Sequence, residues 1–261
     1  MPRLAALFML ILLALPATAE AHRSRLLAKT SKPLPDGLVY AGERFPTPAP
    51  GAPRILFIGD SNFFGPLGLA LQRDYMRLGY HVMLRGKPAS GLANPEFFDW
   101  FAEAGRLIDE FRPDIVVCLL GGNDTQRLSW PYLPGKRIRF ADEVAWRRGY
   151  EGRYRAFARF LSERVAKVYL LSPTNRGWDR ARVAVTRVRE VQQVAVRGLG
   201  NVTWIDMFPH SSNADGTWLR EGMDDHGKRV VFRRPDRVHL TPEGGRLVGQ
   251  RVFANLRRLG V

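Results

Sequence analysis

Three residues in the sequence have the types and the spacing that nucleophilic catalysis requires. Ser61 follows the apolar run RILFIG, and Asp236 and His239 lie together in the segment DRVH near the end of the chain. A serine hydroxyl is a weak nucleophile until a base accepts its proton, and a histidine does this best when a carboxylate orients its ring. Since one loop carries both the acid and the histidine, we predict that these three residues form a catalytic triad.

Attack on a carbonyl group also requires hydrogen-bond donors for the charge that develops on its oxygen. Removing one such donor costs about 3 to 4 kcal/mol of transition-state stabilisation. The candidates are the backbone amide of Ser61, the backbone amide of Gly91 in ASGL, and the side-chain amide of Asn123 in GGND. We predict that these three groups form an oxyanion hole.

The elements that would position these residues alternate along the chain. Five runs rich in Val, Ile and Leu are separated by helix-length segments; they are RILFIGDS, YHVMLRG, PDIVVCLLGGND, KVYLLSPT and NVTWIDM. This alternation predicts parallel strands joined by crossover helices, and so a three-layer α/β domain. A final helix to about Leu259 is predicted after Thr241, a favourable N-cap that Pro242 follows. Ligands of such sheets bind beyond the carboxyl ends of the strands.

Four sequence blocks, in this order along the chain, resemble the marker blocks of the SGNH (GDSL-like) hydrolases. They are GDSN at Ser61, ASGL at Gly91, GGND at Asn123 and DRVH at His239, and the resemblance extends from about residue 54 to the C-terminus. It implies a flavodoxin-like α/β/α fold with about five parallel strands. It also implies that Ser61 is the nucleophile, that His239 is the general base oriented by Asp236, and that Gly91 and Asn123 are oxyanion donors. The stretch SGLANPEFFDW and the block GGNDTQ resemble more narrowly a group of exported SGNH proteins.

Other polar residues compete for these roles or have structural ones. A polar insertion before DRVH holds three alternative triad members, namely Asp224, Asp225 and His226. Contiguous loop residues seldom converge on one ion, so we predict no metal site. The sequence has no GxxxxGK[ST] loop and no GxGxxG after a strand, so we predict no cofactor. Structural roles are expected for three acids that follow strands, Asp60, Asp124 and Asp206, the first as a helix cap.

The N-terminal part has the layout of an export signal. Residues 1–21 have a basic start, an apolar run from Leu4 to about Leu15, and small residues at positions suited to cleavage after Ala19 or Ala21. The run is shorter than the roughly 20 residues that span a bilayer, so we expect cleavage in preference to anchoring. Residues 22–53 are rich in proline and predict a linker or arm, and residues 54–261 predict the hydrolase domain. We expect an exported protein, periplasmic or secreted, without a transmembrane domain after signal removal.

The balance of charge is strongly basic, with 40 Lys and Arg against 25 Asp and Glu and a formal net charge of +15. Such a charge favours acidic partners, which outside the cytoplasm include anionic polysaccharides, cell-wall polymers and lipid headgroups. A solvated, arginine-rich surface would explain the same composition. Nucleic acid is disfavoured as a partner because we recognise no nucleic-acid-binding module. The single cysteine, Cys118, lies in the run IVVCLL and is expected to be buried and inert.

These observations favour hydrolysis of an acyl ester through an acyl-serine intermediate. Because the chain has a predicted export signal and a strongly positive net charge, the favoured substrate is an O-acyl group, for example O-acetyl, on an anionic glycan of the cell envelope. Three alternatives stay open. An O-acyltransferase would use the same triad, a lipase or thioesterase would use aromatic residues at 63–64 and 97–100 for an acyl site, and a non-catalytic protein would only bind envelope polysaccharide.

Overall fold

The computed structural model describes residues 39–40, 43–129, 137–224 and 226–261, and the chain divides into two units after Arg44. In the first unit the described residues form a short antiparallel pair, β1 (Val39–Tyr40) with β2 (Glu43–Arg44). The predicted signal peptide and most of the predicted linker lie outside the described residues, so the predicted domain boundaries stay predictions. Within the described ranges, no helix is long and apolar enough to cross a membrane.

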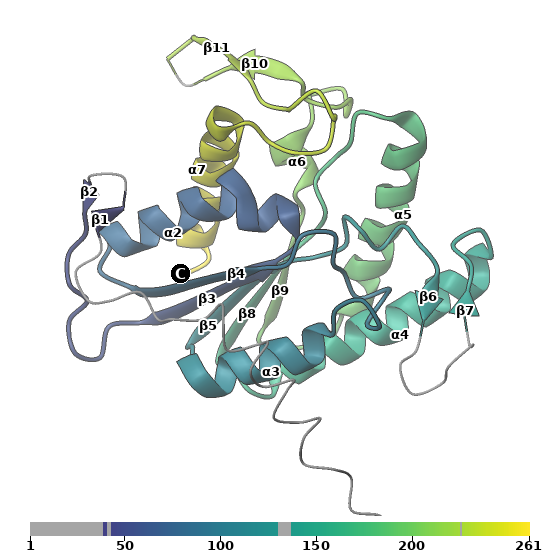
Figure 1. Cartoon of the computed structure of the whole chain (residues 1–261), viewed down its shortest axis with the longest axis horizontal. Coiled ribbons are helices and arrows are strands. Elements are labelled where there is room, and N and C mark those ends of the chain that lie inside the picture. The colour runs from purple at the N-terminus through teal and green to yellow at the C-terminus, as the bar shows by residue number, and fades with distance from the viewer. Residues whose placement is uncertain (1–38, 41–42, 130–136, 225) are drawn as a thin grey trace, which may run out of the picture. The chain divides into compact units, whose positions relative to one another are not determined.

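The second unit, residues 45–261, is built on a five-stranded parallel sheet (Figure 1). Its order is β4-β3-β5-β8-β9, and the strands are β3 (Arg54–Gly59), β4 (His81–Gly86), β5 (Ile115–Leu119), β8 (Lys167–Leu171) and β9 (Val202–Ile205). These are the five apolar runs, so the predicted fold class is confirmed. The chain passes from β3 to β4 on one side and then crosses to β5 on the other. This reversal creates a crevice at the carboxyl ends of β3 and β5, where α/β proteins bind ligands.

Helices cover both faces of this sheet, as Figure 1 shows. Because successive side chains of a strand point to opposite faces, Leu56 and Ile58 pack on one side and Ile55 and Phe57 on the other. The first face is covered by α3 (Trp100–Phe111), α4 (Glu143–Ser162) and α5 (Asp179–Ala195). The second face is covered by α2 (Gly68–Arg77) and α7 (Pro242–Arg258). The result is the predicted three-layer arrangement.

The remaining elements lie in the connections, where no periodic pattern predicts helices or strands. They are the π-helical turn η2 (Phe63–Leu67), the pairs β6 (Leu128–Ser129) with β7 (Arg137–Ile138) and β10 (Glu221–Met223) with β11 (Arg229–Val231), and the short α6 (Phe208–Ser211). Two finer predictions are confirmed. The Thr241 hydroxyl accepts a hydrogen bond from the amide of Gly244 and caps α7, and Cys118 is buried, which raises the pKa of its thiol.

Candidate active site

The three residues of the predicted triad meet beyond the carboxyl end of β3. The Oγ of Ser61 lies 2.9 Å from Nε2 of His239, and Nδ1 of His239 lies 2.8 Å from Oδ2 of Asp236. Both distances are those of ordinary hydrogen bonds. An ionised carboxylate only accepts hydrogen bonds, so Nδ1 of the neutral imidazole carries the proton and Nε2 accepts from the serine hydroxyl. In this tautomer the histidine can take the serine proton.

The Asp236 carboxylate also shapes the loop that carries the histidine. Its Oδ1 accepts hydrogen bonds from the amides of Val238 and His239, each at 2.9 Å, and Arg237 between them has a left-handed φ of 58°. Partial burial raises the pKa of Asp236, but hydrogen bonds from the backbone and side chain of His239 and from the Val238 amide outweigh it and lower this pKa to about 2. The acid therefore stays ionised at any pH near neutrality.

Ser61 lies at a sharp turn between β3 and the following helical segment. The turn requires Gly59, because a Cβ there would lie 2.5 Å from the carbonyl oxygen of Leu119. Asp60 is fully buried and its Oδ1 accepts the amide of Asn62 at 2.9 Å, which is the capping contact expected from the sequence. Burial raises the pKa of Asp60 to about 6, against the lowering effects of the Asn62 amide and the positive charge of Arg176.

The three predicted oxyanion donors are linked through the side-chain amide of Asn123. This amide donates at 2.9 Å to the carbonyl of Ser90, the residue before Gly91. It also lies 3.5 Å from Oδ2 of Asp60, the residue before Ser61. Among the described residues, no group accepts a hydrogen bond from the backbone amides of Ser61 or Gly91. Two unused N–H donors and one side-chain amide thus come from three neighbouring strand ends.

The loop at Gly91 is held by residues that the sequence analysis did not identify. A Cβ on Gly91 would lie 2.2 Å from Oδ1 of Asp124, so the glycine allows the loop to pass over this buried carboxylate. Asp124 accepts hydrogen bonds from the amide of Ala93 at 2.7 Å and from the hydroxyl of Tyr150 at 2.6 Å. Arg153, one turn further along α4, donates to the carbonyls of the same loop. Only the structural role of Asp124 was expected, since the supporting helix carries no recognisable motif.

The competing acids and histidine lie elsewhere in the fold. Asp224 accepts the amides of His226 and Lys228 in the turn between β10 and β11, and neither Asp224 nor His226 contacts the Ser61–His239 pair. Asp225 lies outside the described residues. Asp206 forms a two-point ion pair with Arg189 and so has the structural role expected of it. Among the residues that the structure describes, no three His, Cys, Asp or Glu side chains are grouped so as to hold a metal ion.

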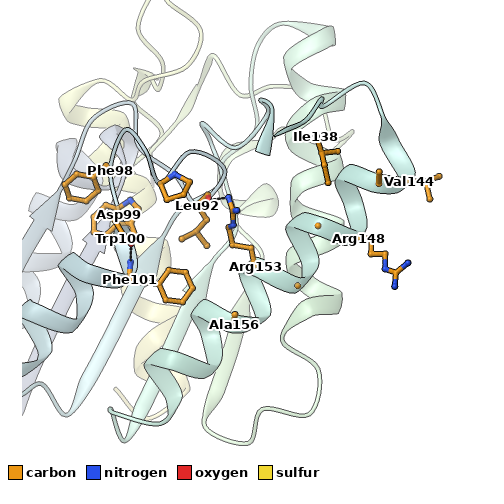
Figure 2. Close-up of a pocket in the computed structure, with 15 residues that line it drawn as sticks. Leu92, Phe98, Asp99, Trp100, Phe101, Ile138, Val144, Arg148, Arg153 and Ala156 are labelled. Atoms are coloured by element: carbon orange, nitrogen blue, oxygen red, sulfur yellow. Dashed lines mark hydrogen bonds between the residues drawn. The ribbon is translucent and has the colours of Figure 1, made fainter. Parts of the chain in front are cut away.

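A groove of about 900 Å³ begins at Gly91 and runs between the start of α3 and the length of α4 (Figure 2). Small residues of α4 at positions 145, 149, 152 and 156 line it, and because they are spaced by three or four they lie on one helix face. Apolar side chains form much of the rest, including Leu92, Phe98, Phe101 and Ile138. The aromatic residues Phe98, Trp100 and Phe101 all line the groove, although Trp100 is almost entirely buried.

The domain has a five-stranded parallel sheet of order β4-β3-β5-β8-β9 between two helical layers. Solved structures share this fold. A variant of an acetyl xylan esterase from Geobacillus stearothermophilus matches with a TM-score of 0.54 at 20% identity, over 80% of this chain and 94% of that one. An alpha/beta hydrolase from the metagenome of Lake Arreo, Spain, matches with a TM-score of 0.54 at 14% identity, over 80% and 98%. A further acetyl xylan esterase matches with a TM-score of 0.53 at 19% identity, over 78% and 99%.

At these identities the likeness shows the fold alone. The chain belongs to the family described as a protein of unknown function, DUF459, whose model matches residues 54–255. No curated protein matches the sequence.

Proposed function

We propose that the protein is a serine esterase that works through an acyl-serine intermediate. The observation that carries this proposal is the continuous chain of hydrogen bonds from Ser61 through His239 to Asp236. Ser61 Oγ attacks the ester carbonyl carbon while its proton passes to Nε2 of the histidine. The histidine then returns this proton to the departing alcohol. Water attacks the acyl-serine in the same way, and the carboxylic acid is released.

The proposed oxyanion hole consists of the Ser61 amide, the Gly91 amide and the Asn123 side chain. Two observations support this proposal. Neither backbone amide has a described protein acceptor, and the Asn123 side chain contacts residues next to Ser61 and next to Gly91. The two backbone amides are held in place before the reaction, so they can stabilise the tetrahedral intermediate without reorganisation. Because the side-chain amide contact to Asp60 is long, at 3.5 Å, one N–H of Asn123 can turn to a substrate oxygen.

For the substrate we propose an O-acyl group, such as O-acetyl, on a glycan of the cell envelope. Two kinds of observation support this. Two of the structures that share the fold are described as acetyl xylan esterases, and a further structure of one of these is described as a catalytic mutant that carries a serine-to-alanine change. The export signal predicted at residues 1–21 and the net charge of +15 fit an exported protein that acts on an acidic polymer.

The groove beside Gly91 favours a second candidate function, the hydrolysis of longer acyl esters or thioesters. Its apolar lining and its start at a proposed oxyanion donor would suit an acyl chain that extends from the reacting carbonyl. Gly152 offers a way to test this, because a Cβ at this position meets no atom within 4 Å. In Gly152→Leu the new side chain would partly fill the groove. If long acyl chains bind there, this variant loses activity on p-nitrophenyl octanoate and keeps it on p-nitrophenyl acetate.

Transfer of the acyl group to a sugar hydroxyl would use the same residues and differs only in the acceptor. Product analysis with and without an acceptor glycan decides between transfer and hydrolysis. A protein that only binds polysaccharide would have no use for a histidine held 2.9 Å from a serine hydroxyl, and this geometry is why we favour an enzyme.

The proposal is tested by the hydrolysis of p-nitrophenyl acetate. We expect activity in the wild-type protein and a loss of at least about 1,000-fold in Ser61→Ala, as is typical when a triad nucleophile is removed. The matched control is Ser162→Ala, since among the described residues the hydroxyl of Ser162 bonds only to the carbonyl of Arg159 in the last turn of α4. Equal activity in the two variants would contradict the proposal.

A further inference from the structure

Arg176 lies just beyond the carboxyl end of β8, next to the strand that carries Asn123. Its guanidinium donates a hydrogen bond to the carbonyl oxygen of Gly122. A Cβ on Gly122 would lie 2.9 Å from Nη2 of Arg176 and 2.9 Å from Oδ2 of Asp60. The guanidinium and the carboxylate beside the nucleophile therefore face the same small space at the strand ends.

The backbone that carries Arg176 is fixed by the preceding residue. Asn175 is fully buried, its Oδ1 accepts the amide of Arg176 at 2.8 Å, and its Nδ2 donates to the hydroxyl of Ser212 at 2.8 Å. This arrangement leaves the arginine side chain directed back over the ends of β5 and β3. The position is therefore built into the fold.

The positive charge of Arg176 has no acidic partner at contact distance. Among the described residues, no carboxylate oxygen lies within 4.0 Å of it, and its only side-chain hydrogen bond goes to a neutral carbonyl. Its Nε and Nη1 donate to no described group, and the side chain is half-buried, not enclosed. Elsewhere in the domain, pairing is common, and Arg106, Arg147 and Arg189 each contact an Asp or Glu.

A second arginine, Arg233, adds positive charge close to Arg176. Arg233 is only 2% exposed, and its Nη1 and Nη2 donate to neutral oxygens of Thr174, Asn175 and Val238. Burial lowers the pKa of Arg233 to about 10, which still leaves it protonated near neutral pH. Because charges interact strongly in a medium of low dielectric constant, these two arginines oppose the negative charges of Asp60 and Asp236 at the site.

We propose that Arg176 binds a carboxylate of the substrate beside the reacting ester, so that the preferred substrates are acyl esters of acidic sugars. The accessible donors of a guanidinium match the planar geometry of a carboxylate. This inference rests on the proposed function and narrows it, because it makes Arg176 a specificity-determining residue for the alcohol side of the ester.

The test uses two substrates that share an acetyl group and differ in one charge. They are 4-acetoxybenzoate and 4-acetoxybenzamide, and kcat/KM for release of acetate from each is divided by its rate of hydrolysis by hydroxide. We expect the wild-type protein to prefer the anion, and Arg176→Gln to lower the anion-to-neutral ratio by at least about tenfold, which is 1.4 kcal/mol. Arg176→Lys should retain part of the preference. Arg180→Gln is the matched control, since it removes one exposed positive charge four residues away and should leave the ratio unchanged.

The outcomes separate this inference from the proposed function. An equal loss on both substrates in Arg176→Gln would mean that the arginine only supports the Gly122 loop, and it would overturn the inference while the esterase proposal stands. No hydrolysis of either substrate by the wild-type protein would overturn both. A second measurement needs no variant, because the wild-type preference for the anion should shrink between low salt and about 0.5 M salt. A preference that salt does not change would also contradict the inference.

Discussion

Replacing Asp236 by asparagine tests the role of the acid with little change in shape. The asparagine Oδ1 can still accept the amides of Val238 and His239, so the loop keeps both of its backbone hydrogen bonds. At the position of Oδ2, however, an N–H group now faces Nδ1 of the histidine, 2.8 Å away. Nδ1 must then accept, which places the proton on Nε2. In this tautomer the histidine cannot take the proton of Ser61.

The size of the effect follows from this change of tautomer. In serine hydrolases the same substitution lowers kcat by about 10,000-fold, which corresponds to about 5 kcal/mol of transition-state stabilisation. Since the backbone hydrogen bonds are kept and the Asp236 side chain is 46% exposed, we expect the free energy of unfolding to change by less than about 1 kcal/mol. Asp236→Asn should therefore lose activity while it keeps its stability.

The assay is p-nitrophenyl acetate hydrolysis together with urea unfolding of Asp236→Asn and Asp236→Ala. The alanine variant loses the two backbone hydrogen bonds as well, so it should lose similar activity and also about 1 to 2 kcal/mol of stability. If the asparagine variant kept more than about a tenth of the wild-type kcat, the assignment of Asp236 as the orienting acid would be wrong.

Three further predictions concern the residues around the site. Gly91→Ala should reduce kcat/KM by about 100-fold or more, measured with p-nitrophenyl acetate, because its Cβ would meet Oδ1 of Asp124 at 2.2 Å and displace the loop amide. Gly152→Ala should raise the free energy of unfolding by about 0.5 to 1 kcal/mol, since it removes a glycine from the interior of α4 where a Cβ meets no other atom. For Asp60, burial raises the pKa from 3.8 to about 6 in the folded protein, so the folded state binds the proton more tightly than the unfolded state. The free energy of unfolding of the wild-type protein should therefore fall by about 3 kcal/mol relative to Asp60→Asn as pH rises between about 4 and 6, and it should level off above about pH 6. Urea unfolding of both proteins across this range measures the difference. If their free energies of unfolding changed in parallel with pH, this prediction would be wrong.

Much of the sheet could be predicted because its three central strands, β3, β5 and β8, are buried on both faces. Such strands read as continuous apolar runs, and each of the five runs became a strand. The polar residues that follow the runs could be placed at one edge because the carboxyl ends of parallel strands lie together. The short pairs β6–β7 and β10–β11 could not be predicted, since two- or three-residue strands in loops have no periodic pattern.

The site was predictable only where a short motif carries it. The blocks at Ser61, Asn123 and His239 predicted groups that the fold brings into hydrogen-bonded reach of one another or of their neighbours. Tyr150 and Arg153 were missed because their partners lie far away in sequence. Arg176 was missed because it lies beyond the run KVYLLSPT and belongs to none of the four sequence blocks. No local pattern distinguishes Arg176, which contacts no carboxylate among the described residues, from the many paired arginines.

The central claim is that His239 activates Ser61 as a nucleophile. The most direct measurement is the reaction of the folded protein with a fluorophosphonate, followed by intact mass and peptide mapping. We expect a single adduct on Ser61 that is absent in Ser61→Ala and greatly slowed in His239→Ala. A folded wild-type protein that takes up no label, or one labelled at a different serine, would contradict the claim.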